Sequence, residues 1–240
     1  IYTGYPKAPE VTVLDHSLDV PVRLAAGTDY KLTYKNNTNP STERKYATVS
    51  ITGKGNYTGT VNTSFHILKN TFSDSQLLVY PKIPSLYYNG KTQKAEIIVY
   101  DKLTQEVLKP QTAYKLTYYN MKEPGTATVL ITPAGSGWSN VTATNKPMLS
   151  TQYEILPGDL SDSAIVSIKA IKRQKYKGKA IEPKPIVKVN GRLLKQGVDY
   201  QVEYTNHTGI SRPDYRPFLV IRGIGPRYTG SSEKMYFDIY

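Results

Sequence analysis

The chain has 240 residues, a formal net charge of +12 and no Cys. Hydrophobic residues make up 39% of the chain, and 21 residues are Tyr. The chain is therefore too apolar to be intrinsically disordered. The lack of Cys excludes a disulfide framework, a Cys-ligated metal site and a thiol nucleophile. No apolar run approaches the roughly 18 residues that span a bilayer, so we expect no membrane insertion. The composition favours a Tyr-rich β protein.

One sequence unit recurs three times along the chain. Each copy has a Tyr-x-Gly motif, then a Tyr-rich segment, and closes with an aromatic residue two positions before an Ile. The motifs are Tyr2–Gly4, Tyr88–Gly90 and Tyr176–Gly178, the segments are 30–34, 114–118 and 200–204, and the closing pairs are Phe65 and Ile67, Tyr153 and Ile155, and Phe237 and Ile239. Landmarks in one order at one spacing indicate tandem repeats. We predict three domains: repeat 1 (1–69), repeat 2 (70–156) and repeat 3 (157–240).

The starts of repeats 2 and 3 share a short motif. Phe72 and Leu160 are each followed by Ser-Asp-Ser, and each lies 16 residues before its Tyr-x-Gly motif. Only Ile1 precedes Tyr2 in this sequence. We therefore predict that repeat 1 lacks its opening strand, and that the native protein continues upstream.

Apolar and polar residues alternate in the middle of each repeat. Ala47, Val49 and Ile51 alternate with hydroxyl side chains, and residues 127–131 repeat the pattern. This period of two indicates half-buried strands. Gly, Asn and Pro interrupt the chain every 8–12 residues or so, as in an all-β sandwich. No window has sustained helical spacing, so the sequence predicts an all-β fold.

A turn is predicted just before each Tyr-rich segment. Gly27 and Gly197 allow a positive φ there, and Asp29 and Asp199 are expected to bond a backbone N–H two residues on. The Tyr that follows is expected to begin the next strand. These Asp residues are therefore expected to form turns and not to serve as ligands or acids. Repeat 2 has Gln111 and Ala113 in their places, so we expect a different turn there.

The landmarks together resemble a known family. Repeat 1 carries Tyr-x-Gly, Leu-x-x-Gly-x-Asp-Tyr, Tyr-x-Asn-Asn and Ala-x-Val-x-Ile-x-Gly-x-Gly-x-Tyr-x-Gly in order, from Tyr2 to Gly59. This order resembles the tandem immunoglobulin-like (Ig-like) repeats of large Gram-positive bacterial cell-surface proteins; repeat 2 departs from it most. The resemblance implies three Ig-like β-sandwich domains placed end to end, outside the cell and attached to its surface or wall. It implies a monomeric, non-enzymatic stalk that presents adhesive or carbohydrate-active domains of the same polypeptide.

Residues for catalysis are scattered. His16, His66 and His207 fall at unrelated places, so no cluster for metal binding or acid–base chemistry is expected. The sequence has no Gly-rich phosphate loop. We expect no enzyme activity, no cofactor and no metal. An intramolecular Lys–Asn amide stays open, because the sequence does not place the required Lys, Asn and acid.

An alternative function is the binding of a polysaccharide or a host glycoprotein. Repeat 2 has an insertion near 141–150 beside the only Trp, Trp138. Binding residues are often carried by loops on a rigid scaffold, and Trp138, Tyr119 and Tyr87 are candidates for stacking on sugars. The competing interpretation is that Trp138 only replaces a packed Tyr, Tyr57.

Repeat 3 offers a second candidate surface. It carries 15 basic and 8 acidic residues, and the candidates for binding anions are Lys172, Arg173, Lys175 and Arg227. Such a face attracts acidic polymers through its summed potential. The competing interpretation is a solvated basic strand that protects a sheet edge. Nucleic acid is not expected, since no nucleic-acid motif is present.

Overall fold

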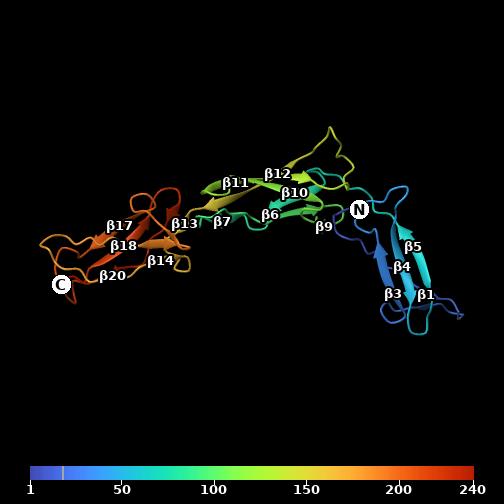
Figure 1. The fold of residues 1–240 in the computed structure, drawn as a ribbon, viewed down its shortest axis with the longest axis horizontal. Helices are drawn as coiled ribbons and strands as arrows, with labels where there is room; N and C mark the ends of the chain where they lie inside the picture. Colours follow the sequence, from blue (N-terminus) through green and yellow to red (C-terminus); the bar gives the residue numbers. More distant parts are fainter. Residues whose placement is uncertain (18) are drawn as a thin grey trace. The chain divides into compact units, whose positions relative to one another are not determined.

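The computed structural model describes residues 1–17 and 19–240 (Figure 1). The described residues form strands, turns and irregular segments and no helix, which confirms the prediction of an all-β chain. Accordingly, they contain no helix that could cross a membrane. The predicted Ig-like identity and the count of three domains stay predictions.

Two compact units emerge from the contacts within the chain. Unit 1 comprises residues 1–80, 97–117 and 129–151, and unit 2 comprises 81–96, 118–128 and 152–240. Repeat 1 lies in unit 1 and repeat 3 in unit 2, while repeat 2 contributes to both. The division therefore does not follow the repeat boundaries.

Repeat 1 contains one three-stranded and one two-stranded antiparallel sheet. The first has the order β3-β4-β5, formed by Tyr30–Lys35, Ala47–Gly53 and Thr60–Phe65. The second pairs β1 (Leu14–Asp15) with β2 (Val22–Arg23).

Repeat 2 contains two larger sheets. One has the order β10-β11-β12-β7, formed by Tyr114–Tyr119, Gly125–Pro133, Leu149–Leu156 and Ser85–Tyr87. The other has the order β6-β8-β9, formed by Leu77–Pro81, Ile97–Asp101 and Glu106–Val107. The segment 134–148, which holds the predicted insertion, links β11 to β12 and contains no strand.

Repeat 3 repeats this plan with shorter strands. One sheet has the order β17-β18-β20, formed by Tyr200–Thr205, Phe218–Gly223 and Met235–Tyr236. A second has the order β14-β15-β16, formed by Val166–Ile168, Val187–Val189 and Arg192–Leu193. A short parallel pair joins β13 (Gly158–Asp159) to β19 (Tyr228–Thr229).

The predicted strand starts and alternation are confirmed. Tyr30, Tyr114 and Tyr200 each begin a strand and are buried. Ala127, Val129 and Ile131 are fully buried on one face of β11. A sheet that is apolar on one face needs an opposing layer to cover it.

Tyrosine hydroxyls of the central strand in each repeat donate to backbone carbonyls in or just before a strand of the other sheet. The Tyr114 hydroxyl donates to the carbonyl of Ile97 in β8 at 3.4 Å, and the Tyr118 hydroxyl donates to Ala95 O at 2.9 Å. The corresponding bonds in repeat 1 run from Tyr30 to Val11 O and from Tyr34 to Pro9 O, and those in repeat 3 run from Tyr200 to Pro185 O and from Tyr204 to Pro183 O. Each ring fills a thin core while its hydroxyl satisfies a backbone carbonyl.

The turn predicted to differ in repeat 2 has the same backbone conformation as the other two and lacks only the Asp side chain. Gln111 adopts a positive φ of 63°, beside 87° for Gly27 and 81° for Gly197. Its N–H donates to Tyr114 O at 2.9 Å, and the two Gly residues make the same bond to the Tyr three positions on. The backbone hydrogen bonds therefore impose this turn even on a residue with a Cβ, at the cost of local strain.

The Asp residues of these turns bond differently from the prediction. Asp29 accepts a hydrogen bond from the N–H of Ala25 at 2.7 Å, four residues upstream, and Asp199 accepts the same bond from Lys195 at 2.9 Å. Both carboxylates therefore stabilise the turn, as expected, but they bond to an N–H upstream of the Asp and not downstream.

Candidate functional site

The most elaborate cluster of buried aromatic and polar residues surrounds Tyr2 in unit 1. We call it the first joint, because it brings the Tyr-x-Gly motif of repeat 1 against residues of repeat 2. Its members are Tyr2, Thr3, Gly4, Asn70, Phe72, Asp101, Thr112, Ala113, Gly137 and Trp138. Figure 1 shows the N-terminus lying near β9 and the end of β5.

Backbone and hydroxyl hydrogen bonds hold the Tyr-x-Gly motif in place. Tyr2 N donates to Leu68 O at 2.9 Å, and the N–H of Lys109 donates to Thr3 O at 2.9 Å. The Tyr2 hydroxyl donates to Thr112 O at 3.0 Å. The motif thus bonds on one side to the end of its own repeat and on the other to repeat 2.

Aromatic rings fill the centre of the first joint. Trp138 is only 2% exposed, and its ring meets those of Tyr2 and Phe72 edge to face at centroid distances of 5.7 and 4.9 Å. Its indole N–H donates to the carbonyls of Ala113 and Ala134, each at 3.0 Å. Such pairs favour the edge-to-face arrangement because of the ring quadrupole.

Glycine is required where the Tyr2 ring lies on the backbone. A Cβ at Gly137 would come within 1.9 Å of the Tyr2 ring, and one at Gly4 would lie 3.0 Å from the Cβ of Ala113. Gly4 also has a φ of 85°, which side chains rarely adopt. The Gly of the motif therefore allows the close approach of the two repeats.

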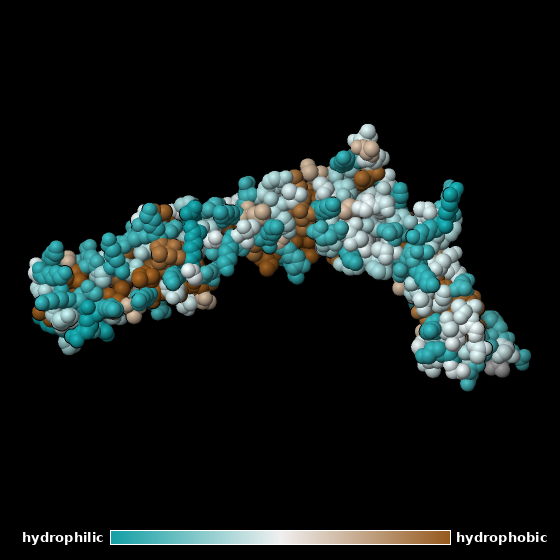
Figure 2. Space-filling model, viewed as in Figure 1, coloured by the Kyte–Doolittle hydropathy of each residue, from teal (hydrophilic) through white to brown (hydrophobic). Residues whose placement is uncertain are grey.

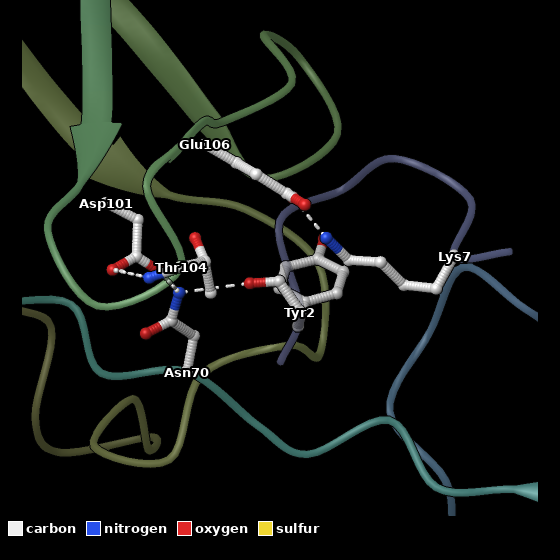
Figure 3. Close-up of polar contacts among 6 residues, drawn as sticks. All are labelled: Tyr2, Lys7, Asn70, Asp101, Thr104 and Glu106. Carbon is white, nitrogen blue, oxygen red and sulfur yellow. Dashed lines mark hydrogen bonds and ion pairs between the residues drawn. The ribbon is translucent and has the colours of Figure 1, made fainter. Parts of the chain in front are cut away.

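A buried amide–carboxylate pair lies beside these rings (Figure 3). Asn70 Nδ2 donates to Asp101 Oδ2 at 2.6 Å and to Tyr2 O at 3.0 Å. Asp101 Oδ1 accepts from the side-chain amide of Gln76 and from the N–H of Leu103 at 2.9 Å. Asn70 is 3% exposed and Asp101 0%, so the pair replaces the water that both groups would otherwise bind.

The hydrogen bonds also set the ionisation of Asp101. Burial alone would raise the pKa of this carboxyl, but the bonds from Leu103, Asn70 and Gln76 outweigh it and lower the pKa below its usual range. The carboxyl is therefore ionised at neutral pH, and each of its acceptor oxygens has donors. At the rim, Lys7 forms an ion pair with Glu106 (Figure 3).

A second joint in unit 2 has the same backbone arrangement. Tyr88 N donates to Leu156 O at 2.7 Å, as Tyr2 N does to Leu68 O. The Tyr88 ring meets that of Tyr228 at 5.4 Å. A Cβ at Gly158 would lie 2.7 Å from Tyr88 O, so this joint also depends on close backbone approach.

The polar contacts of the second joint differ. An arginine takes part: Arg192 Nη1 donates to the Tyr88 hydroxyl at 2.6 Å. The Tyr228 hydroxyl is buried and has no hydrogen-bond partner among the described residues. Burial raises the pKa of Tyr228 to about 12, with a smaller contribution from the neighbouring Tyr88.

The third Tyr-x-Gly motif keeps the shape, but among the described residues it makes no such contact with another repeat. Tyr176 N donates to Tyr240 O at 2.7 Å, and Gly178 has a φ of 71°. The Tyr176 ring is half-buried, and a Cβ at Gly178 would meet no atom within 4 Å. The motif thus folds in the same way whether or not it contacts a following repeat.

The sequence-predicted binding residues do not form one site. Trp138 is buried in unit 1 and its ring is covered by Tyr2 and Phe72, so it offers no face for stacking on a sugar. Tyr87 and Tyr119 belong to unit 2 and are 63% and 48% exposed. Tyr87 lines a cavity of about 510 Å³ with Asp159, Asp162 and Asn190, among others.

The basic candidates are all in unit 2. Lys172, Arg173 and Lys175 are exposed, and the Arg173 guanidinium lies 4.9 Å from the centre of the Tyr240 ring. Arg227 is instead half-buried and makes an ion pair with Glu123 at 2.8 Å. Figure 2 shows hydrophilic side chains interspersed with apolar patches at the end of unit 2 that holds the C-terminus.

Other chemistry has little support in the described residues. They contain no group of three or more His, Asp or Glu side chains that could hold a metal. No Lys is among their buried residues, so they do not show the buried Lys that an intramolecular amide needs. Sequence reasoning missed the Asn70–Asp101 pair, whose only signal was a polar residue at the seam between repeats.

Comparison with known proteins does not place the chain in a family. No protein-family model matches the sequence, and a search of curated proteins finds no significant relative.

Proposed function

We propose that the chain is a non-enzymatic spacer in a bacterial cell-surface protein, made of three Ig-like repeats that present adhesive or carbohydrate-active domains. The observation that carries this proposal is the recurrence of one joint. Tyr2 and Tyr88 lie in successive repeats; each bonds to the end of its own repeat and packs against an aromatic ring of the next. A spacer needs such joints, because a flexible linker would let the presented domain fall back.

The Gram-positive surface location rests on the resemblance in the landmarks from Tyr2 to Gly59. The absence of Cys suits a secreted repeat that folds without disulfides.

The stiffness of the first joint tests the proposal. The native chain has no Cys, so Thr63→Cys and Leu103→Cys, both at exposed positions of unit 1, can carry a pair of spin labels. We expect a narrow distance distribution in the full chain by pulsed electron paramagnetic resonance. Trp138→Ala should broaden it, while Tyr119→Ala, an exposed aromatic in unit 2, should not. A broad distribution in the unmutated chain would refute the spacer role.

A second function, the binding of anionic glycans, is favoured by the exposure of Lys172, Arg173 and Lys175. Opposite charges attract over about 10 Å at moderate salt, and more salt screens them. Heparin titrated into the full chain should bind at 50 mM salt and lose most affinity when these three residues are replaced by Glu. Equal binding by that variant would exclude this surface. The version of this alternative that relies on Trp138 is not retained, because the ring is buried.

A further inference from the structure

One sheet of repeat 1 has fewer strands than its counterparts. The hairpin β8–β9 of repeat 2 is extended by β6, and the hairpin β15–β16 of repeat 3 is extended by β14. The equivalent hairpin β1–β2 stands as a two-stranded sheet in the described structure. The outer edge of β1 is therefore free, and a free edge is a template for an added strand.

The side chains behind this edge are also less covered than their counterparts. Leu24, Ile51 and Tyr57 are half-buried and line a groove of about 310 Å³. The residues at the same places in repeat 2 are Leu108, Ile131 and Trp138, which are 2%, 0% and 2% exposed. Val61, on β5, also lines the groove and is 65% exposed. Repeat 1 thus has an open groove, lined by these apolar side chains and at its rim by Asp15 and His16, where repeat 2 has a closed core.

The backbone of β1 shows which groups face outward. Leu24 N donates to Val13 O at 2.9 Å, so Val13 bonds inward to β2. Successive residues of a strand point their N–H and C=O to opposite sides. The N–H and C=O of Leu14 therefore face the free edge, where they can pair with an added strand.

The chain itself shows how such an edge is filled. In repeat 2 the N–H of Lys102 donates to Gln76 O at 3.1 Å, and the Phe72 ring lies on Trp138. In repeat 3 the opening strand β14 pairs antiparallel with β15. Both opening segments begin with an apolar residue and Ser-Asp-Ser, and alternate apolar residues follow.

We propose that the free edge of β1 and the groove behind it bind an extended segment with this repeat-opening pattern. The segment pairs antiparallel with residues 13–15, as β14 pairs with 187–189. Its leading apolar side chain takes the place of Phe72 and covers Tyr57, and its alternate apolar side chains enter the groove beside Leu24 and Ile51. The added strand continues the β1–β2 sheet and gives repeat 1 the layer that repeats 2 and 3 have.

A synthetic peptide of residues 71–81 is the probe. Labelled with a fluorophore and titrated with the full chain, it should show saturable binding by anisotropy. Backbone N-methylation at Leu78 should weaken binding at least roughly fivefold, since its N–H lies on the side that faces β8 in repeat 2, and one net hydrogen bond is worth about that factor. N-methylation at Val79, which faces the other way, should be tolerated.

A pair of variants locates the site. Val61→Glu places a charge in the groove at an exposed position, so it should abolish binding and leave folding intact. Leu193→Glu, at a position 62% exposed in repeat 3, is the matched control and should bind normally. In addition, residues 70–86 grafted ahead of Ile1 should raise the Tm of the chain, because a group that binds only the folded state stabilises it.

Two results would overturn the proposal. One is no binding up to about 1 mM peptide together with an unchanged Tm in the grafted chain. The other is a peptide affinity that is changed neither by N-methylation at Leu78 nor by Val61→Glu, since the peptide would then bind elsewhere.

Discussion

The two joints share a backbone and differ in chemistry. In both, a Tyr-x-Gly motif bonds to the C-terminal end of its own repeat, and a ring of the next repeat packs on the Tyr. In the first joint the Asn70–Asp101 pair lies beside the rings, and each oxygen of the Asp101 carboxylate accepts a hydrogen bond. The second has Arg192 at its rim and leaves the Tyr228 hydroxyl without a partner. The landmarks thus fix the approach of the repeats, while the residues between them decide how polar each joint is.

The largest expected effect is at the aromatic centre of the first joint. Trp138→Ala removes the ring that packs on both Tyr2 and Phe72, and should lower the free energy of unfolding of unit 1 by about 3–5 kcal/mol. Denaturant titration followed by circular dichroism measures it. Tyr119→Ala, at an exposed position, should change stability by less than about 0.5 kcal/mol. Equal losses in both variants would show that Trp138 is not central.

The polar pair of the first joint comes next. Asp101→Ala leaves the amide of Asn70 and the N–H of Leu103 without their acceptor in a dry site, which should cost about 2–3 kcal/mol. Since Trp138 is the only Trp, its fluorescence reports on this joint, and we expect its red shift at lower denaturant in the variant. If the transition midpoint did not move, water would have replaced the carboxylate at no cost.

The second joint should instead be sensitive to alkali. The folded pKa of Tyr228, about 12, is above the usual value of 10.0, so the folded state holds this proton more tightly than the unfolded state. The resulting stability is fully present below pH 10 and is lost as the pH rises through 12, a difference of at most about 2–3 kcal/mol. Denaturant titrations below pH 10 and near pH 12, followed by circular dichroism, should show this loss.

Tyr228→Phe is the matched control for the alkaline effect. It keeps the ring and removes a buried hydroxyl that has no partner, so stability at pH 7 should hold or rise slightly. Other tyrosines also have raised pKa values. Therefore only the part of the alkaline loss of stability that disappears in Tyr228→Phe is assigned to Tyr228. An unchanged alkaline profile would contradict the assignment.

The first joint should be sensitive to acid. Because hydrogen bonds lower the folded pKa of Asp101 below its value in the unfolded chain, its contribution is present above that unfolded pKa and disappears as the pH falls through the folded one. Trp138 fluorescence should therefore change at strongly acidic pH before the second joint opens. In Asp101→Asn this acid dependence should be reduced; its persistence would assign the transition to other carboxylates.

The smallest effect belongs to the rim of the first joint. Lys7→Ala removes the ion pair with Glu106. The Glu106 side chain is 50% exposed and that of Lys7 is 19% exposed. Pairs of this kind are worth less than about 1 kcal/mol, so we expect a loss of at most about 0.5 kcal/mol that vanishes in high salt. A loss as large as that of Asp101→Ala would mean that the rim, and not the buried pair, holds the joint.

Much of the fold could be predicted from the sequence. The period-two pattern at 127–131, the Tyr that begins each central strand and the all-β character all follow from local rules of side-chain alternation. The turn at Gln111 could not be predicted, because the backbone hydrogen bond from Gln111 N to Tyr114 O imposes a positive φ that its side chain disfavours.

The residues of the first joint could be predicted from the sequence only in part. Trp138 stood out as the only Trp, but its burial depends on Tyr2 and Phe72, which lie far away in the chain. The Asn70–Asp101 pair joins residues 31 positions apart and carries no motif.

By itself, the sequence determined the repeat, its landmarks and its period-two strands, because these depend on residues close together in the chain. Only the tertiary structure decided that the Tyr-x-Gly motifs form joints, that Trp138 is buried and that a groove lies open beside Leu24 and Ile51. Each of these depends on which distant surface covers a side chain, and burial is a property of the assembled layers and not of any local segment.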